Sequence, residues 1–303
     1  MPQFVRKNSI PEFFQSHPKH KGVALLFGLM LYNENSCVLT YMISIFTIFF
    51  LTLGLTIGSF LNVVIYRLGT HRSLGGRSAC LSCQKVLSWF ELVPFFSFIF
   101  LSGRCRSCKS RISVIYPAVE LITGFVFTGI YLKFQEVLFF NPPAFLATFS
   151  YYATAFSLLV VISFYDLRHK IVPDSLALSL GILSFLGLFL FDGSGFHLHL
   201  PSLFEFLSGP LIAVPFALFW LVSKGVWMGL GDAKLILSMG WLIGISRALS
   251  AAVLSFWSGA VFGIMLILFS GKHGLKSEIP FAPFLAFSAI VAFLFELHIF
   301  PFF

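Results

Sequence analysis

The chain has 303 residues, of which 58% are hydrophobic and 11% are charged. Soluble domains carry roughly 25% charged residues, so this composition excludes an ordinary soluble domain and indicates a polytopic membrane protein. The formal net charge of +8 could suit a nucleic-acid partner, but the basic residues lie between apolar runs, as membrane topology requires. We therefore predict contact with membrane lipid and no nucleic-acid partner.

Residues 1–40 form a mixed N-terminal tail of uncertain status. The tail holds four basic residues and an apolar patch over residues 22–32, which is shorter than the roughly 20 residues that span a bilayer. No small-residue cleavage site marks it as a signal peptide. Met42 stands at the start of the first long apolar run, so translation from Met42 is an open alternative.

Eight apolar runs follow, and they predict an all-α polytopic membrane protein with about eight transmembrane helices. The runs cover residues 41–65, 114–132, 145–165, 175–191, 207–223, 234–246, 249–269 and 280–300, and the sixth is short. We divide the chain into the tail (1–40), the first transmembrane helix (41–66), a four-cysteine domain (67–113) and a transmembrane core (114–303).

The polar segments between these runs predict the orientation. Residues 67–113 hold eight Lys or Arg against one acid, and the alternate segments 166–174, 224–234 and 271–278 each add two basic residues. The intervening segments supply only Lys133 and Arg247. By the positive-inside rule the basic set is cytoplasmic. The tail would then lie outside despite its basic residues, a conflict that a start at Met42 would remove.

Four cysteines form the strongest spacing signal. Cys80 and Cys83 make one CxxC pair, and Cys105 and Cys108 make a second pair, with 21 residues between the two pairs. Two such pairs on a basic segment are typical of a structural four-cysteine zinc site, and redox-active thiols are the alternative. The apolar stretch 89–101 between the pairs is too short to span, so we expect it to pack under the cysteines or against the membrane face.

A carboxylate stands in a glycine-rich turn between two uncharged runs, in the sequence Gly229-Leu-Gly-Asp232-Ala-Lys234. Asp166 ends an earlier apolar run, and the predicted topology puts it on the same cytoplasmic side as Asp232. Carboxylates in such settings are costly unless they have a partner or a function. Asp166 and Asp232 are therefore our candidate catalytic pair. The alternative is that each pairs with a nearby cation, Arg168 or Lys170 for Asp166 and Lys234 for Asp232.

Such a pair suits peptide hydrolysis by an activated water. Two carboxylates roughly 3 Å apart cannot both ionise, so one can take a proton from water while the other donates to the carbonyl oxygen. Gly229 and Gly231 would allow a tight turn and the close approach of a helix or substrate. Asp174, which follows Pro173, reads better as a residue that stabilises the start of a helix.

Two further features lie in the first two apolar runs. Gly54 and Gly58 form a GxxxG pattern, which predicts a helix-packing face. Glu120 is a carboxylate near the cytoplasmic end of the second run, where it could support a helix contact or a second site.

Together these motifs resemble the prepilin leader peptidase family, the membrane aspartic peptidases of type IV pilus and type II secretion systems. The resemblance covers about residues 58–288, and its six motifs occur in the family's order. They are Gly58–Leu68, the four cysteines, Ile112–Glu120, Asp166–Asp174, Gly229–Leu235 and Ile279–Phe281. The chain departs from the family at Ala282, where glycine is usual.

The resemblance implies that Asp166 and Asp232 are the catalytic aspartates and that the four cysteines hold structural zinc. It implies precursors of type IV prepilins or pseudopilins as substrates, cleaved after glycine on the cytoplasmic side of the bacterial inner membrane. Many members then methylate the new N-terminal residue, commonly Phe, with S-adenosylmethionine as methyl donor. The complete cysteine domain favours that second activity, but no motif identifies the residues that would bind the donor.

Three other functions stay open at this stage. One is a peptidase without methylase activity. A proton-coupled transporter would use Asp166, Asp232 and Glu120 as a relay, but it leaves the cysteine domain unexplained. A structural subunit of a secretion assembly would use the cysteine domain for docking and would tolerate Asp232→Asn.

Overall fold

The computed structural model describes residues 36–70, 73, 75–192, 195–226, 228–270 and 279–299. Most of the predicted tail and the basic segment 271–278 lie outside the described residues. The chain divides into two compact units, residues 1–49 and 50–303. In the first unit the structure describes the beginning of helix α2, and all contacts reported below lie within the second unit.

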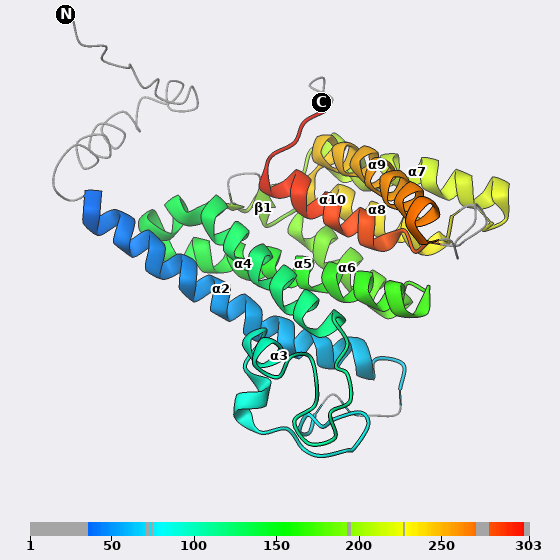
Figure 1. Cartoon of the computed structure of the whole chain (residues 1–303). Helices are drawn as coiled ribbons and strands as arrows, with labels where there is room; N and C mark the ends of the chain where they lie inside the picture. Colours follow the sequence, from blue (N-terminus) through cyan, green and yellow to red (C-terminus); the bar gives the residue numbers. More distant parts are fainter. Residues whose placement is uncertain are drawn as a thin grey trace, which may run out of the picture. The chain divides into compact units, whose positions relative to one another are not determined.

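The described part of the chain is mostly helical, which confirms the predicted fold class (Figure 1). The elements are α2 (Ser36–Arg67), η3 (Trp89–Leu92), α3 (Phe96–Phe100), α4 (Ile115–Phe140), α5 (Pro142–His169), α6 (Asp174–Gly187), β1 (Phe191–Asp192), β2 (Gly195–Phe196), α7 (Leu203–Ser223), α8 (Leu230–Ile243), α9 (Ile245–Ser270) and α10 (Ala282–Leu294). The two short strands pair antiparallel, with Phe191 opposite Phe196.

Within the described residues, five helices are long and apolar enough to cross a membrane, namely α2, α4, α5, α7 and α9. The predicted count of eight spans is therefore not confirmed. The remaining predicted spans correspond to α6, α8 and α10, which have 14, 14 and 13 residues. Helices of that length are about 20 Å long, shorter than the roughly 30 Å hydrocarbon core of a bilayer.

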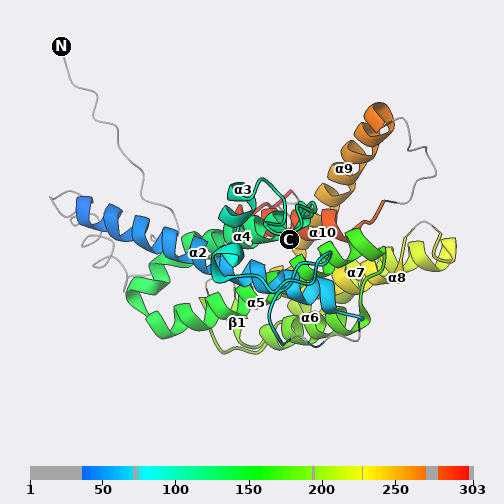
Figure 2. The ribbon, with the colours of Figure 1, turned by 60° about the horizontal axis from the view of Figure 1, so that its bottom comes forward.

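Helix α5 lies at the centre of the second unit. Its most apolar stretch is 72% buried, against 11% for α9. It packs against α4, α6 and α10, and α4 and α5 run side by side in both views (Figures 1 and 2). Asn141 separates α4 from α5, and its side-chain oxygen accepts a hydrogen bond from the Ala144 N–H at 3.3 Å, which caps α5.

Aromatic side chains fill the space between α4, α5 and α10. Phe134 of α4 stacks on Tyr152 of α5, and Phe293 of α10 packs against Tyr152 and Phe156 with ring centroids 4.5 and 5.0 Å apart. Phe156 and Phe293 are both fully buried. Close packing of this kind holds helices together in a membrane, where apolar burial alone gives little driving force.

The GxxxG pattern of α2 packs as predicted. A Cβ atom on Gly54 would lie 2.7 Å from the Thr123 carbonyl oxygen, and one on Gly58 would lie 2.7 Å from the Glu120 Cα. The missing side chains therefore let the backbones of α2 and α4 meet. This contact places the start of α4 beside the end of α2, so that the cysteine domain connects two neighbouring helix ends.

Candidate functional site: two buried aspartates and a four-cysteine cluster

The two candidate catalytic carboxylates come from different parts of the chain. Asp166 lies in the last turn of α5 and Asp232 in the first turn of α8, and the two residues are 5% and 7% exposed. Asp232 lies outside the five long apolar helices, and burial, followed by the negative charge of Asp166, raises its pKa to about 7. The structure therefore places Asp232 close enough to Asp166 to be affected by its charge.

One of the two glycines before Asp232 permits a close contact. A Cβ atom on Gly231 would lie 2.7 Å from the Cβ of Val172, which follows α5. Gly231 therefore lets the start of α8 approach the segment after Asp166. Gly229 has a φ of −73°, which any residue adopts, and the nearest atom to its Cβ position lies 3.8 Å away. The local packing therefore requires glycine at position 231 and does not require it at position 229.

Two of the basic residues near the aspartates, Lys234 and Arg168, contact other side chains. Lys234, considered above as a partner of Asp232, pairs instead with Asp174, with Nζ 2.6 Å from Oδ1. The guanidinium of Arg168 lies over the Tyr66 ring, 4.2 Å from its centroid. Asp174 is the first residue of α6, in agreement with its predicted structural role.

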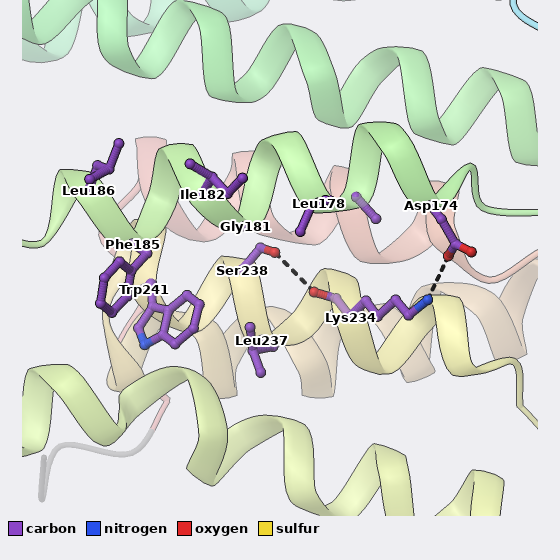
Figure 3. Close-up of a pocket in the computed structure, with 11 residues that line it drawn as sticks. Asp174, Leu178, Gly181, Ile182, Phe185, Leu186, Lys234, Leu237, Ser238 and Trp241 are labelled. Atoms are coloured by element: carbon purple, nitrogen blue, oxygen red, sulfur yellow. Dashed lines mark hydrogen bonds and ion pairs between the residues drawn. The ribbon is translucent and has the colours of Figure 1, made fainter.

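A groove of about 610 Å³ lies between α6 and α8 (Figure 3). In the sequence, α6 follows Asp166 and α8 includes Asp232. The Asp174–Lys234 ion pair lies at one end, and Phe185 and Trp241 meet at the other with ring centroids 5.2 Å apart. The remaining lining residues are apolar or small: Ala177, Leu178, Gly181, Ile182, Leu186, Leu237 and Ser238. The groove therefore suits an apolar chain with a polar group at one end.

The four predicted cysteines come together, which confirms the cluster. Their sulfur atoms all lie within 4.8 Å of one another, and the Sγ atoms of Cys80 and Cys108 are 3.8 Å apart. A tetrahedral zinc site with Zn–S bonds of about 2.3 Å has sulfur atoms about 3.8 Å apart, so these residues fit the ion. Two isolated bridges, Ala79 with Val86 and Arg104 with Arg111, form the turns that present each pair.

The thiols of Cys80, Cys83 and Cys108 do not ionise alike. The backbone N–H of Cys83 is the main cause that lowers the pKa of Cys80 to about 6, and the Ser110 hydroxyl lowers the pKa of Cys108. The Lys85 N–H favours the thiolate of Cys83, but desolvation and the neighbouring thiols outweigh it and raise its pKa to about 11. Four thiolates so close together need a cation, and a bound divalent metal would supply it.

Glu120 lies apart from the aspartates in the contacts that the structure describes. Its Oε2 accepts a hydrogen bond of 2.7 Å from the backbone N–H of Phe95. The carboxylate therefore connects α4 to the cysteine domain. That contact favours the predicted structural role over the proton relay that would join Glu120 to Asp166 and Asp232.

No residue set for S-adenosylmethionine emerges from the described parts of the chain. The groove between α6 and α8 offers the ion pair and one hydroxyl, and a second pocket between α9 and α10 is lined by apolar side chains and Ser258. An adenosine and amino-acid ligand needs several convergent polar groups. These two pockets do not fit the methyl donor, and we assign no residue to it.

Two residues that contact the site were not predicted from the sequence. The backbone N–H of Ala282, the first residue of α10, interacts with the Asp166 carboxylate. Trp241 closes the groove and donates its Nε1–H to the Phe206 carbonyl at 3.0 Å. The Ile279–Phe281 motif, which directly precedes Ala282, was a signal for the first contact, and the second depends on helix packing that no local pattern encodes.

Two family profiles match the chain. Residues 52–134 match the bacterial peptidase A24 N-terminal domain, which includes the cysteine cluster, and residues 153–264 match the type IV leader peptidase family, which includes both aspartates.

Curated relatives agree with these profiles. Prepilin leader peptidase/N-methyltransferases from Myxococcus xanthus and Bacillus subtilis are 34% and 32% identical, over 77% and 84% of this chain and 67% and 94% of their own lengths. The enzyme of that name from Aeromonas salmonicida is 32% identical over 80% of this chain and 88% of its own. No solved structure matches. With the site described above, these similarities place the chain in the type IV leader peptidase family.

Proposed function

We propose that this protein removes the leader peptide of type IV prepilin-like precursors and methylates the new N-terminal residue. The relatives that match most of the chain carry both activities in their names. One observation carries the proposal, namely the buried pair Asp166 and Asp232 at adjoining helix ends. Burial and the raised pKa of Asp232 support a pair that shares one proton, as in aspartic peptidases.

The pair can hydrolyse a peptide bond without further catalytic groups. The ionised carboxylate takes a proton from water as the water oxygen bonds to the carbonyl carbon, and the protonated carboxyl donates its proton to the carbonyl oxygen. Collapse of the tetrahedral intermediate breaks the C–N bond, and a carboxyl proton goes to the leaving amine. Burial strengthens these electrostatic interactions.

The groove between α6 and α8 supports a position for the substrate. Lys234 at its end lies two residues after Asp232, and its walls are apolar. We place the apolar residues that adjoin the scissile bond in this groove. Gly181→Leu, which fills the groove, is expected to raise KM about tenfold with kcat nearly unchanged. Gly181→Ala should leave both constants close to wild type, because a Cβ atom there meets only the Ser238 Oγ, at 3.4 Å.

The four-cysteine cluster supports a structural zinc ion held by Cys80, Cys83, Cys105 and Cys108. S-adenosylmethionine, when bound, supplies the methyl group for the second activity. The basic segments support an orientation in the bacterial inner membrane with the aspartates at the cytoplasmic side. A leader rich in basic residues would then meet the aspartates on the side where it is made.

The deciding experiment is cleavage of a membrane-inserted precursor with a basic leader that ends in Gly-Phe, followed by the mass of the product. Asp166→Asn and Asp232→Asn should each abolish cleavage in folded protein, and Glu136→Gln, which changes an exposed carboxylate of α4 away from the groove, should retain it. Cleavage that survives either catalytic substitution would contradict the proposal. A gain of one methyl group that depends on S-adenosylmethionine tests the methylase, and its absence would leave a peptidase alone.

A further inference from the structure

An apolar surface on the cysteine domain has no role in the site described above. Residues Trp89–Phe100, which we call the interfacial segment, form η3, α3 and the turn between them. Its most exposed large side chains are Trp89 (79%), Phe100 (83%), Ile99 (54%) and Phe96 (51%). The segment is no membrane span, so lipid along a transmembrane helix does not explain this exposure. Contiguous exposed apolar residues mark an interaction surface.

The contact with Glu120 gives the depth of this segment. Glu120 lies five residues after Ile115, the first residue of α4, which corresponds to about 7.5 Å along the helix axis. Because its carboxylate accepts the Phe95 N–H at 2.7 Å, the start of α3 lies beside α4 at that level. Amphipathic helices that lie in a membrane interface bury their apolar face roughly 5–10 Å deep.

The backbone at this junction is held in an unusual conformation. Phe95 has a φ of 61°, in the left-handed region that non-glycine residues seldom adopt. The hydrogen bond to a 7%-exposed carboxylate holds the strained residue in place. Glu120 therefore ties the interfacial segment to α4 at a defined depth.

The domain that carries the apolar surface is basic. Residues 75–114 contain six basic side chains and one acid, Glu91, whose carboxylate accepts the Ser88 N–H at the start of η3. The guanidinium of Arg106 lies 5.1 Å from the centroid of the Phe90 ring, at the edge of the apolar surface. A basic substrate leader would be repelled here, whereas the phosphates of anionic lipid would be attracted.

We propose that the interfacial segment anchors the cysteine domain in the cytoplasmic face of an anionic phospholipid bilayer. The exposed aromatic and aliphatic side chains enter the acyl boundary, Arg106 contacts lipid phosphate, and Glu120 holds the segment at this depth. The anchor prevents the domain, which joins two neighbouring helix ends, from tilting away from the membrane. It does not depend on the peptidase chemistry.

The test measures the depth of Trp89 in the whole protein in nanodiscs. The contribution of Trp89 is the tryptophan fluorescence of the wild type minus that of Trp89→Phe. It is recorded in lipid with and without bromine near the acyl boundary. In bilayers that contain phosphatidylglycerol, bromine should quench this difference signal at least about twofold. Trp257→Phe, which removes an exposed tryptophan of the long helix α9, gives the positive control for quenching.

Two variants separate the parts of the proposal. Arg106→Gln should weaken the quenching of Trp89 in anionic lipid and leave it unchanged in phosphatidylcholine. Glu120→Gln, which keeps the shape and weakens the acceptor, should reduce quenching in both lipids. An unquenched Trp89 signal in anionic lipid would overturn the anchor, and equal quenching in the two lipids would overturn the role of anionic headgroups. No outcome depends on cleavage activity.

Discussion

The four cysteines and the two aspartates are both clusters of like groups, but they lie in opposite surroundings. In the described residues 75–114, Cys105 is the one buried side chain. Around the aspartates, α5, α8 and α10 bury many apolar side chains. A domain without a core depends on a bound ion for its fold, whereas a packed bundle can hold two repelling carboxylates that lower its stability.

Metal removal should have the largest effect, and it should be confined to the cysteine domain. We expect a chelator, or Cys105→Ser, to unfold residues 75–114, because the cluster replaces the core that this region lacks. Proteolysis followed by mass spectrometry measures this as new cleavage sites there, with the bundle still protected. Cys37→Ser, which removes a thiol outside the CxxC pairs, is the control. If the cysteine domain stays protected from proteolysis after complete loss of metal, its fold does not depend on a bound ion.

Phe293→Ala should destabilise the helix bundle and leave the cysteine domain folded. Phe293 is fully buried between α4, α5 and α10, so its truncation should lower the free energy of unfolding of the bundle by about 3–5 kcal/mol. Detergent-based unfolding measures the loss. Phe287→Ala on the same helix removes a side chain that is 61% exposed and should change stability little. Metal content should stay at wild-type level in both variants.

Gly58→Val should weaken the contact between α2 and α4. Its Cβ atom would lie 2.7 Å from the Glu120 Cα, and the helix shift that relieves this clash should cost about 1–3 kcal/mol of unfolding free energy. Gly181→Val has room and serves as the control, since the nearest atom to its Cβ position lies at 3.4 Å. Equal stability of the two variants would argue against close packing at the GxxxG pattern.

Asp232→Asn should abolish cleavage and yet stabilise the bundle by about 1 kcal/mol at pH 8. The folded state raises the pKa of Asp232 to about 7, so it disfavours the ionised form. Stability of the wild type relative to the variant should therefore fall as the pH rises from the ordinary carboxyl range towards 7, and then level off. Unfolding measured at pH 5 and pH 8 tests the sign, and a variant less stable than wild type at pH 8 would refute it.

Lys234→Gln should have the smallest effect. The ion pair with Asp174 joins side chains that are 43% and 80% exposed, so its loss should change the unfolding free energy by less than about 0.5 kcal/mol. Lys133→Gln is the informative comparison, because the Lys133 side chain is 11% exposed and pairs with Glu296. We expect the larger loss for Lys133, in the same unfolding assay.

Much of the site could be predicted because its signals are local. Each CxxC pair lies in one turn, each aspartate ends or begins an apolar run, and Gly54 and Gly58 occupy one helix face. The partners of these residues could not be predicted. Lys234 lies two residues from Asp232 but pairs with Asp174, since Asp174 begins the helix that packs beside α8.

The sequence by itself determined that this is a helical membrane protein, that its cysteines form a cluster and that two aspartates stand at the ends of apolar runs. These properties follow from composition and short spacing, which act along the chain. The tertiary structure decided the lengths of α6, α8 and α10, the influence of the Asp166 charge on Asp232 and the hydrogen bond by which Glu120 holds Phe95 beside α4. Those features arise from contacts between residues far apart in the chain, whose geometry depends on how whole helices pack.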